Sequence, residues 1–466
     1  MKFVADACAA EIRRPSSVAL RRVDGAGDAP VKNVCTDSRS ARPGDLFFAI
    51  RGERFDGHNY LNEVAAKGAA AVVVEQKKVP ESLPDCPVLV VDDVRVALGR
   101  LAAAYRKEFE LPVIAVGGSN GKTTTKELIA AVLRQKLATL WSEASFNNDI
   151  GVPLTLLRLD RSHRAAVLEA GTNHPGELAP LVEMIRPKYG VLTNIGREHL
   201  EFFGDLAGVA QEEGRLAERL PSDGKLWVDG DNEWTDPIAK RTRAAVVRVG
   251  LGEKNDWRAR SIRLDKNGAT FRVEAPTAGW GGEYRINLLG RHQVTNALFA
   301  VAVSEELGLG RPAVRDGLAE CPPAKMRLQF WEAGGVRVLD DAYNANADST
   351  LAALETLCAL PLQGRRVAVL GDMNELGAGS EAAHAEVGRR AAELGIGQLF
   401  AVGKMAPVTA AAARQAGLAR VFEFADVEAA VKAVKGFLKA GDVVLLKASR
   451  ASRLERIAAT LKSGKW

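Results

Sequence analysis

A glycine-rich loop between an apolar strand and an amphipathic helix constrains the fold of this chain more than any other feature. The loop, Gly118-Ser119-Asn120-Gly121-Lys122-Thr123-Thr124, follows the apolar segment 112–116. Glycines let backbone N–H groups close around phosphate oxygens, and a helix N-terminus adds positive potential. The loop therefore predicts a parallel α/β sheet that binds phosphate groups. One face of the helix that follows it carries Leu128, Ile129, Val132 and Leu133.

The loop also indicates which side chains would handle a bound nucleotide. Lys122 can reach the terminal phosphates, and Thr123 can ligate Mg²⁺. The run departs from the pattern G-x-x-x-x-G-K-T, because Val116 occupies the first glycine position. A plain glycine-rich turn would explain the glycines, but not a Lys-Thr pair in register with them. We expect ATP and Mg²⁺ as cofactors, bound by Gly118, Ser119, Asn120, Gly121, Lys122, Thr123 and Thr124.

The length of 466 residues suits three domains of about 150 residues each. We expect a first α/β domain over residues 1–108, with strands near 69–74 and 88–91 and a helix over 93–108. A central domain with the phosphate loop should span 109–322. Its further strands are predicted at 165–168 and 191–193.

The last part of the chain, residues 323–466, alternates apolar runs with alanine-rich helical stretches such as 381–394. This alternation predicts a doubly wound, Rossmann-like parallel sheet. The overall fold class is therefore α/β, with a central phosphate-loop ATPase domain and a C-terminal Rossmann-like domain. The strands of the third domain are predicted at 336–339, 366–370, 399–402 and 443–446.

Composition excludes several classes of partner. The formal charge is +5, from 63 basic and 58 acidic residues without a clustered run, so no nucleic-acid partner is expected. No run of about 18 apolar residues predicts a membrane span, and Asp6 interrupts any signal-peptide core. The odd, scattered cysteines indicate free thiols in a reducing compartment. We expect a cytoplasmic monomer.

Two residues at strand ends of the central domain are candidate metal ligands. Glu169 ends the strand 165–168, in the crevice where parallel sheets bind ligands. There it could hold Mg²⁺ beside a triphosphate, although a carboxylate alone is more often a surface or capping acid. His199 follows the strand 191–193 and could serve a second metal. With Lys122, these residues form the predicted catalytic set.

The first domain contains a hydroxyl-rich turn, Thr36-Asp37-Ser38-Arg39. Such a turn with one arginine suits a phosphate or uracil group. The residues alone favour the simpler interpretation, which is an exposed Asx-type turn.

Three polar clusters follow strands of the third domain. They begin at Asp340-Asp341, at Gly371-Asp372 and at Lys447, and the first continues through Asn344 and Asn346. Carboxyl ends of parallel strands lie on one edge of a sheet. Three clusters at that edge predict a binding site rather than three unrelated loops.

Together these motifs resemble the Mur ligase family across nearly the whole chain. Within the family, the runs 341–346 and 371–377 are similar to the member that adds D-alanyl-D-alanine. The histidine-asparagine-proline and Asp-Asn-Pro-Arg motifs of the member that adds the third amino acid are absent from the sequence. The runs and residues that carry the resemblance are 36–39, 118–124, 145–151, Glu169, 199–201, 290–292, Asn296, 341–346 and 371–377.

The resemblance implies a function in peptidoglycan synthesis. ATP would phosphorylate the carboxylate of UDP-N-acetylmuramoyl-tripeptide, and the amine of D-alanyl-D-alanine would attack the acyl phosphate. Thr36, Asp37, Ser38 and Arg39 would bind the UDP end of the precursor. Asn296, Arg327 and Asp341 would contact ATP, and Asn344 and Asn346 would face the incoming dipeptide.

The chain departs from the family at two positions. Ala347 stands where the family usually has proline. The family bridges its second Mg²⁺ with a carbamylated lysine about fourteen residues after the histidine, and the corresponding residue is Glu213. Either Glu213 replaces the carbamate as a metal ligand, or it is an ordinary glutamate on a helix surface, with the metal held by Glu169 and His199. Both alternatives stay open on spacing alone.

Two rival functions remain at this stage. One is another ligase of the same superfamily, of the folylpolyglutamate or diaminopimelate-adding type. The other is a nucleotide-regulated binding module without chemistry. Only the first rival would release ADP in the presence of an amine acceptor.

Overall fold

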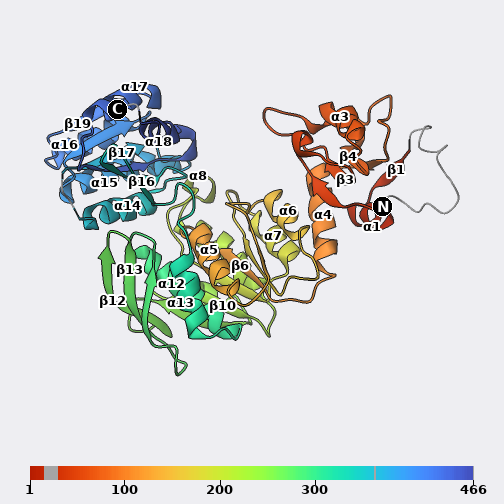
Figure 1. The fold of residues 1–466 in the computed structure, drawn as a ribbon, viewed down its shortest axis with the longest axis horizontal. Coiled ribbons are helices and arrows are strands. Elements are labelled where there is room, and N and C mark those ends of the chain that lie inside the picture. Colours follow the sequence, from red (N-terminus) through yellow and green to blue (C-terminus); the bar gives the residue numbers. More distant parts are fainter. Residues whose placement is uncertain (15–29, 362–363, 465–466) are drawn as a thin grey trace.

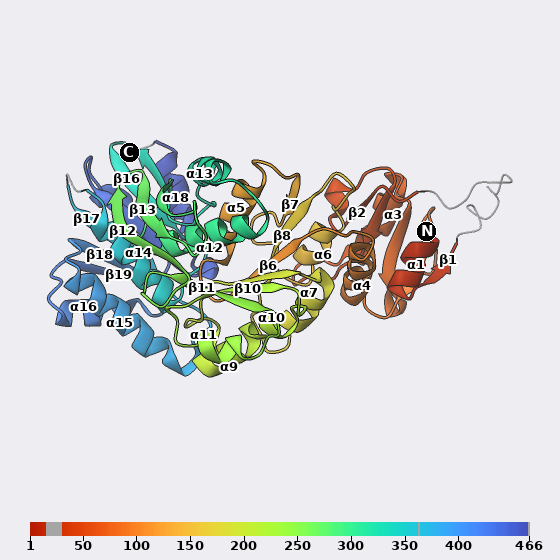
Figure 2. The same cartoon turned by 90° about the horizontal axis from the view of Figure 1, so that it is seen from below.

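The structure is a computed structural model that describes residues 1–14, 30–361 and 364–464. Three sheets follow one another along the chain, each with its own helices (Figures 1 and 2). We call them the first, central and third units. This arrangement confirms the predicted α/β class, while the boundaries at residues 108 and 322 stay predictions.

The first unit is a five-stranded sheet. Its elements are α1 (Lys2–Cys8), β1 (Glu11–Arg13), β2 (Asn33–Cys35), η1 (Ser38–Ser40), β3 (Asp45–Phe48), η2 (Gly57–Tyr60), α3 (Leu61–Ala66), β4 (Ala71–Glu75), η3 (Gln76–Lys78), β5 (Val88–Val91) and α4 (Val94–Arg106). The strand order is β1-β5-β4-β3-β2, with β1 antiparallel to β5 and the other pairs parallel. Helix α4 begins where predicted, because the Asp93 carboxylate accepts hydrogen bonds from the first-turn N–H groups of Arg95 and Val96.

The central unit has a nine-stranded sheet. Its elements are β6 (Val113–Gly117), α5 (Lys122–Leu133), β7 (Thr139–Trp141), α6 (Gly151–Leu156), β8 (Ala165–Glu169), α7 (Leu178–Ile185), β9 (Tyr189–Leu192), α8 (Leu200–Phe203), α9 (Leu206–Glu213), α10 (Arg215–Glu218), β10 (Lys225–Asp229), α11 (Thr235–Ala239), β11 (Ala245–Gly250), β12 (Trp257–Asp265), β13 (Gly268–Glu274), β14 (Gly282–Ile286), α12 (His292–Glu306) and α13 (Arg311–Glu320).

The strand order β14-β13-β12-β11-β10-β9-β6-β8-β7 places β6 between β8 and β9. The three strand ends predicted to carry chemistry therefore lie side by side, since these strands are parallel. The antiparallel extension β12–β14 was not predicted. Its alternating buried and exposed positions are typical of a sheet with one face in water.

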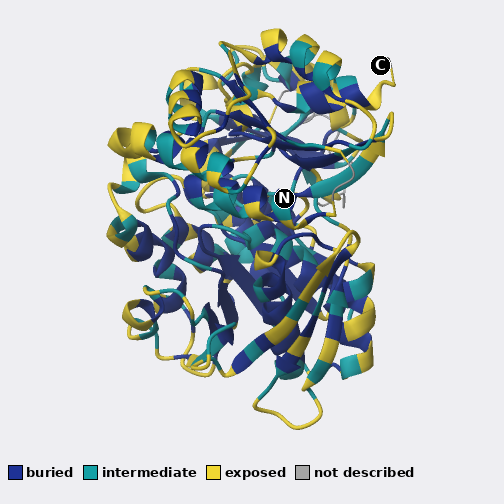
Figure 3. Cartoon of the chain, turned by 90° about the vertical axis from the view of Figure 1, so that its left-hand side faces the viewer, coloured by how far each residue is buried: buried dark blue, intermediate teal, exposed yellow. Residues whose placement is uncertain are grey.

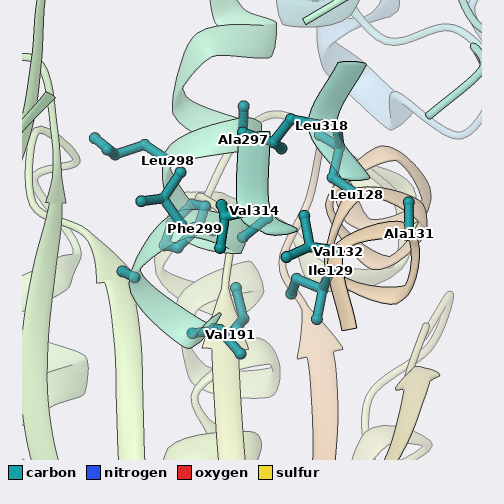
Figure 4. Close-up of a cluster of buried hydrophobic side chains, with 14 of the residues drawn as sticks. Leu128, Ile129, Ala131, Val132, Val191, Ala297, Leu298, Phe299, Val314 and Leu318 are labelled. Carbon is teal, nitrogen blue, oxygen red and sulfur yellow. The ribbon is translucent and has the colours of Figure 1, made fainter. Parts of the chain in front are cut away.

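The predicted buried face of α5 packs against α12 and α13 in the central core (Figure 4). Leu128, Ile129, Val132 and Leu133 are fully buried there. Burying side chains of this size stabilises the unit by about 1.5–3 kcal/mol each. This packing holds the N-terminal end of α5, and with it the phosphate loop, against the sheet.

The third unit has a six-stranded sheet. Its elements are β15 (Gln329–Ala333), β16 (Val336–Asp341), α14 (Ala347–Ala359), β17 (Arg366–Gly371), η4 (Gly377–Gly379), α15 (Ser380–Glu393), β18 (Gln398–Val402), α16 (Ala406–Gln415), β19 (Val421–Phe424), α17 (Val427–Phe437), β20 (Val443–Lys447), η5 (Arg450–Ser452) and α18 (Glu455–Lys462). The order is β15-β16-β20-β17-β18-β19, parallel except for the edge strand β15.

Separate apolar clusters cover the two faces of this third sheet, which confirms the doubly wound arrangement. Buried residues follow the strands, and exposed residues gather on the outer faces of the helices (Figure 3). Within the described ranges, no helix is long and apolar enough to cross a membrane.

Candidate active site

The phosphate loop joins β6 to α5 through two glycines with left-handed backbone angles. Gly118 has φ +108° and Gly121 has φ +86°, a region that other residues rarely adopt. A Cβ on Gly118 would also lie 2.5 Å from Thr193 Oγ1, and one on Gly121 would lie 2.5 Å from Asn296 Oδ1. The backbone carbonyl and side-chain oxygen of Asn194 accept N–H groups of the loop at 2.9 Å. The loop is therefore held in shape by its neighbours.

Lys122, the first residue of α5, folds back over the loop. Its ammonium group donates hydrogen bonds to the carbonyl oxygens of Gly118 and Ser119. It also lies 3.3 Å from Glu198 Oε2. The partners of the Lys122 ammonium group are thus two loop carbonyl oxygens and one carboxylate.

Three buried glutamates surround Lys122. Burial alone would lower the pKa of Lys122, but Glu198, Glu213 and Glu169 raise it above its usual value. One oxygen of each carboxylate is buried without a hydrogen-bond partner, namely Glu169 Oε2, Glu198 Oε1 and Glu213 Oε1. Unsatisfied buried carboxylate oxygens are expected where a cation binds. No group of three or more His, Cys, Asp and Glu side chains in the described parts of the chain could hold a metal ion unaided.

Glu169 lies at the end of β8, as predicted, and is buried. Its Oε1 accepts a hydrogen bond of 2.8 Å from Asn147 Nδ2, and its backbone N–H donates to Ser142 Oγ at 3.1 Å. A Cβ on Gly171 would lie 2.5 Å from the Asn147 amide. The amide therefore orients Glu169 through Oε1, while Oε2 has no hydrogen-bond partner.

His199 has a positive φ of 48° and lies between β9 and α8. Its Nδ1 is paired with the Glu375 carboxylate of the third unit, and its Nε2 lies 3.9 Å from Glu198 Oε2. The backbone N–H of Glu201 donates to the Glu375 carbonyl at 3.0 Å. Glu375 also has a positive φ, of 61°. Two residues in a sparsely populated backbone region thus meet across the unit interface.

Glu213 ends α9 and is fully buried behind the loop. Its Oε2 accepts a 2.6 Å hydrogen bond from the Gly118 N–H, and a Cβ on Gly117 would lie 3.1 Å from the same oxygen. Burial raises the pKa of Glu213, against the opposing effect of Lys122. The alternative that Glu213 is a helix-surface residue is therefore wrong. Two cavities border the loop, and Glu213 lines neither of them.

The third unit places two predicted nucleotide residues beside the loop. Arg327 Nη2 lies 3.4 Å from Thr123 Oγ1, and its guanidinium stacks 4.2 Å over the Tyr343 ring. Asp341 forms a buried ion pair of 2.7 Å with Lys447. Arg327, Asp341 and Thr123 line one cavity of about 220 Å³ at the N-terminal end of α12.

Asn296 lines the same cavity from α12. Its Oδ1 accepts from Thr125 Oγ1 at 3.2 Å, and its Nδ2 donates to Gln293 Oε1 at 2.8 Å. Thr124 also faces this cavity. The cavity thus joins the phosphate loop to the N-terminal part of α12.

The three polar clusters of the third unit meet as predicted, because β16, β20 and β17 are neighbours. Lys447 Nζ donates to the Asn344 carbonyl at 2.8 Å, and Ser449 Oγ accepts from the Asn374 N–H at 2.9 Å. Asn346 caps α14 and also donates to Asn120 Oδ1 of the phosphate loop at 2.9 Å. Both polar atoms of the Asn346 side chain therefore already make hydrogen bonds within the protein.

A second cavity, of about 440 Å³, connects these clusters with the loop. Lys122, Glu169 and His199 line it from the central unit, while Asn344 and Asn346 line it from the third. The structure therefore brings the predicted catalytic residues and the predicted acceptor residues to one space.

The predicted turn at residues 36–39 belongs to the first unit and is distant in sequence from the residues of this site. Asp37 Oδ1 accepts from the Arg39 N–H at 3.0 Å, which is the Asx-type turn that the residues favoured. The Arg39 side chain lowers the pKa of Asp37 to about 2. The turn nevertheless borders a cavity of about 340 Å³, lined by Thr36, Asp37, Ser38, Arg39, Phe55 and Tyr60, among others.

Sequence reasoning missed several residues at the site. Glu198 and Glu375 were not singled out, although Glu198 directly precedes His199 and Glu375 lies inside the 371–377 run. Arg197 was also missed. It bridges to Asp348 and Glu386 of the third unit, at 2.6 Å each. Only the adjacency of Glu198 to His199 offered a signal, since the other pairs join residues more than 150 positions apart.

Comparison with known proteins supports the geometry. Family models match residues 30–106 (Mur ligase family, catalytic domain), 116–304 (Mur ligase middle domain) and 326–450 (Mur ligase, glutamate ligase domain). The UDP-N-acetylmuramoyl-tripeptide–D-alanyl-D-alanine ligase of Escherichia coli strain K12 is 38% identical over 93% of this chain and 94% of its own length.

Solved structures agree with this result. MurF from Acinetobacter baumannii superposes with a TM-score of 0.86 at 31% identity, covering 99% of this chain and 98% of that one. MurF from Thermotoga maritima, solved with ADP, gives 0.79 at 26% identity, covering 94% and 99%. With the family models, the identity to the Escherichia coli enzyme and the site geometry in agreement, this chain belongs to the Mur ligase family.

Proposed function

We propose that this chain is an ATP-dependent ligase that joins D-alanyl-D-alanine to UDP-N-acetylmuramoyl-tripeptide. One observation carries the proposal. The phosphate loop of the central unit and the polar clusters of the third unit line a single cavity of about 440 Å³. A phosphoryl donor and an amine acceptor can therefore meet beside Lys122.

The chemistry explains why one cavity must serve both ends of the reaction. A carboxylate does not react with an amine until one of its oxygens becomes part of a leaving group. Transfer of the terminal phosphoryl group of ATP to the tripeptide carboxylate forms an acyl phosphate and ADP. The dipeptide amine then attacks the carbonyl carbon, loses a proton, and phosphate leaves.

Charge neutralisation is the main task of the central unit. ATP and the carboxylate are both anionic, so the transferred group needs positive charge around it. Lys122 and the N-terminal end of α5 supply that charge from the protein. For this step Lys122 must turn from Glu198 toward the terminal phosphate. Arg327 and Asn296 hold the nucleotide at the neighbouring cavity.

The residues present also fit Mg²⁺, which when bound would neutralise phosphate charge as a Lewis acid. Thr123 lies in the loop at the first turn of α5, and Glu169 presents a buried oxygen without a partner. His199 lines the same cavity as Glu169, and its Nε2 lies 3.9 Å from Glu198 Oε2. Mg²⁺ commonly takes one or two protein carboxylates together with substrate phosphates. The sparse protein ligand set is consistent with that pattern.

The two outer units would select the substrates. The first-unit cavity, bordered by Arg39 and the exposed ring of Phe55, suits a uridine diphosphate group. Asn344 and Asn346 would face the dipeptide in the third unit. The three cavities that would bind nucleotide, dipeptide and precursor are lined by residues of one chain, which supports a monomer. Five free cysteines, four of them buried, support a reducing, cytoplasmic location.

An ADP-release assay over pairs of substrates tests the proposal. We expect rapid ADP release only when UDP-N-acetylmuramoyl-tripeptide and D-alanyl-D-alanine are present together. A preference for a free amino acid, such as glutamate or diaminopimelate, would instead assign another ligase of the superfamily. Nucleotide binding without amine-dependent ADP release would make the chain a binding module.

A further inference from the structure

Glu198 is a buried carboxylate that lines the reaction cavity, and its negative charge is only partly neutralised by its neighbours. Its Oε2 lies 3.3 Å from Lys122 Nζ and 3.9 Å from His199 Nε2. Its Oε1 is buried without a hydrogen-bond partner. The side chain is 7% exposed and lines the cavity together with Glu169. Glu198 is therefore placed to bind a cation or a hydrogen-bond donor that enters this cavity.

Glu213 is placed differently, although it is equally buried. Its Oε2 is bound to the Gly118 N–H at 2.6 Å, behind the loop and outside the cavity lining. Moving this carboxylate toward the cavity would break the hydrogen bond to the loop. Of the two glutamates, only Glu198 can reach the cavity without disturbing the phosphate loop.

Nucleotide binding changes the environment of Glu198. When Lys122 turns to the phosphates, Glu198 loses its nearest cation and gains anionic neighbours. A buried carboxylate left in that state is strongly destabilising. A divalent cation between Glu198 and the phosphates removes the repulsion, since carboxylate oxygens are preferred ligands of Mg²⁺.

His199 offers the second ligand of such a site. Its Nδ1 is held by Glu375 of the third unit, which leaves Nε2 on the side of Glu198. A carboxylate on one ring nitrogen is the usual way in which proteins orient a metal-binding histidine. Helix α8, which follows His199, lies against the third unit (Figure 1).

We propose that Glu198 exchanges partners during the reaction cycle. In the nucleotide-free pocket it neutralises Lys122, and with nucleotide bound it ligates a divalent cation together with His199. Glu213 stays on the Gly118 N–H throughout and positions the loop. The proposal rests on the proposed function only in requiring a nucleotide in the cavity.

The test measures binding rather than turnover. Mn²⁺, read by electron paramagnetic resonance, and a non-hydrolysable ATP analogue, read by calorimetry, are the probes. Glu198→Gln keeps the shape and removes the charge. We expect it to weaken Mn²⁺ binding in the presence of the analogue by about tenfold or more. In the absence of metal it should bind the analogue more tightly than the parent, because Lys122 is released.

Opposite changes in the two affinities distinguish this role from structural damage, which would weaken both. Glu213→Gln should leave Mn²⁺ affinity within about twofold while weakening the analogue, since only the loop is disturbed. Glu201→Gln, on the exposed surface of α8, is the matched control and should change neither. Glu198→Asp keeps the charge and should retain part of the Mn²⁺ binding if the glutamine variant does not fold.

Unchanged Mn²⁺ affinity in folded Glu198→Gln would overturn the proposal, as would a loss confined to Glu213→Gln. These results are separate from failure of the proposed function. If the proposed function failed, the parent chain would bind the analogue and Mn²⁺ but would not release ADP with the two substrates.

Discussion

The two interfaces of the central unit differ in chemistry. Toward the first unit, α4 packs against α6 and α7, and Ala102 shares an apolar cluster with Leu156 and Val182. Toward the third unit, Leu289 joins an apolar cluster, but Arg197 meets Asp348 and Glu386 through ion pairs, and His199 meets Glu375 in the same way.

This difference indicates which unit can move. Separating an apolar interface exposes apolar surface to water, which costs a free energy of about 25 cal/mol per Å². The first unit should therefore stay attached to the central unit. Partly exposed ion pairs contribute about 0–1 kcal/mol each, and water replaces them when they separate. We therefore expect the third unit to move away from the phosphate loop to admit substrates and to return to exclude water. Across the same interface, Glu375 pairs with His199, and Asn346 donates to Asn120 of the phosphate loop.

The largest expected effect lies at neither interface. Lys122→Ala should lower ligation by about 1000-fold, because the transferred phosphoryl group loses its main protein cation. Both interfaces should be unchanged, which small-angle scattering and thermal unfolding can verify. Near-normal turnover in a folded variant would show that the chemistry does not depend on the loop lysine.

Breaking the apolar interface should mainly reduce stability. Ala102→Asp places a carboxylate in a fully buried position between the first and central units, at a cost of about 3 kcal/mol or more. Urea unfolding measures the loss. Val96→Asp on the same helix, where the side chain is 50% exposed, is the control and should change little. Equal stability of both variants would mean that α4 does not hold the two units together.

Breaking the polar interface should mainly reduce activity. Arg197→Ala removes both ion pairs to the third unit and should lower kcat/KM by about tenfold, with a stability loss near 1 kcal/mol. Scattering should show a more extended molecule, and salt near 1 M should extend the parent chain in the same way.

Arg95→Ala is the matched control for this test. It removes the exposed ion pair of 3.1 Å between Arg95 and Asp149, which joins the first and central units. Since apolar packing holds that interface, neither activity nor shape should respond. Similar extension in both variants would contradict the distinction between the interfaces.

The smallest effect concerns a polar contact within the apolar interface. Tyr105 Oη donates to the Leu159 carbonyl at 2.9 Å, and Tyr105→Phe should lower the free energy of unfolding by about 1 kcal/mol. Ligation at saturating substrate should not change. A lower ligation rate at saturating substrate would show that the first unit also takes part in closure.

Local patterns predicted much of the fold. The bounds of α4 agree with the expected helix over 93–108 within a few residues, and α5 buries the face that was expected, because capping and apolar spacing act over short stretches. The strands β6, β8 and β16 were found as apolar runs of the expected kind. The strands β12–β14 were not, because half-exposed strands carry a weaker signal than buried ones.

The sequence by itself determined the phosphate loop, its lysine and the glutamate at the end of β8. These follow from residue spacing around one turn, where backbone geometry leaves few alternatives. Only the tertiary structure decided that Glu198 faces the cavity, that Glu213 binds the loop from behind, and that Glu375 reaches His199 from 176 residues away. Those contacts depend on how units pack, and the direction of a side chain across an interface leaves no local pattern.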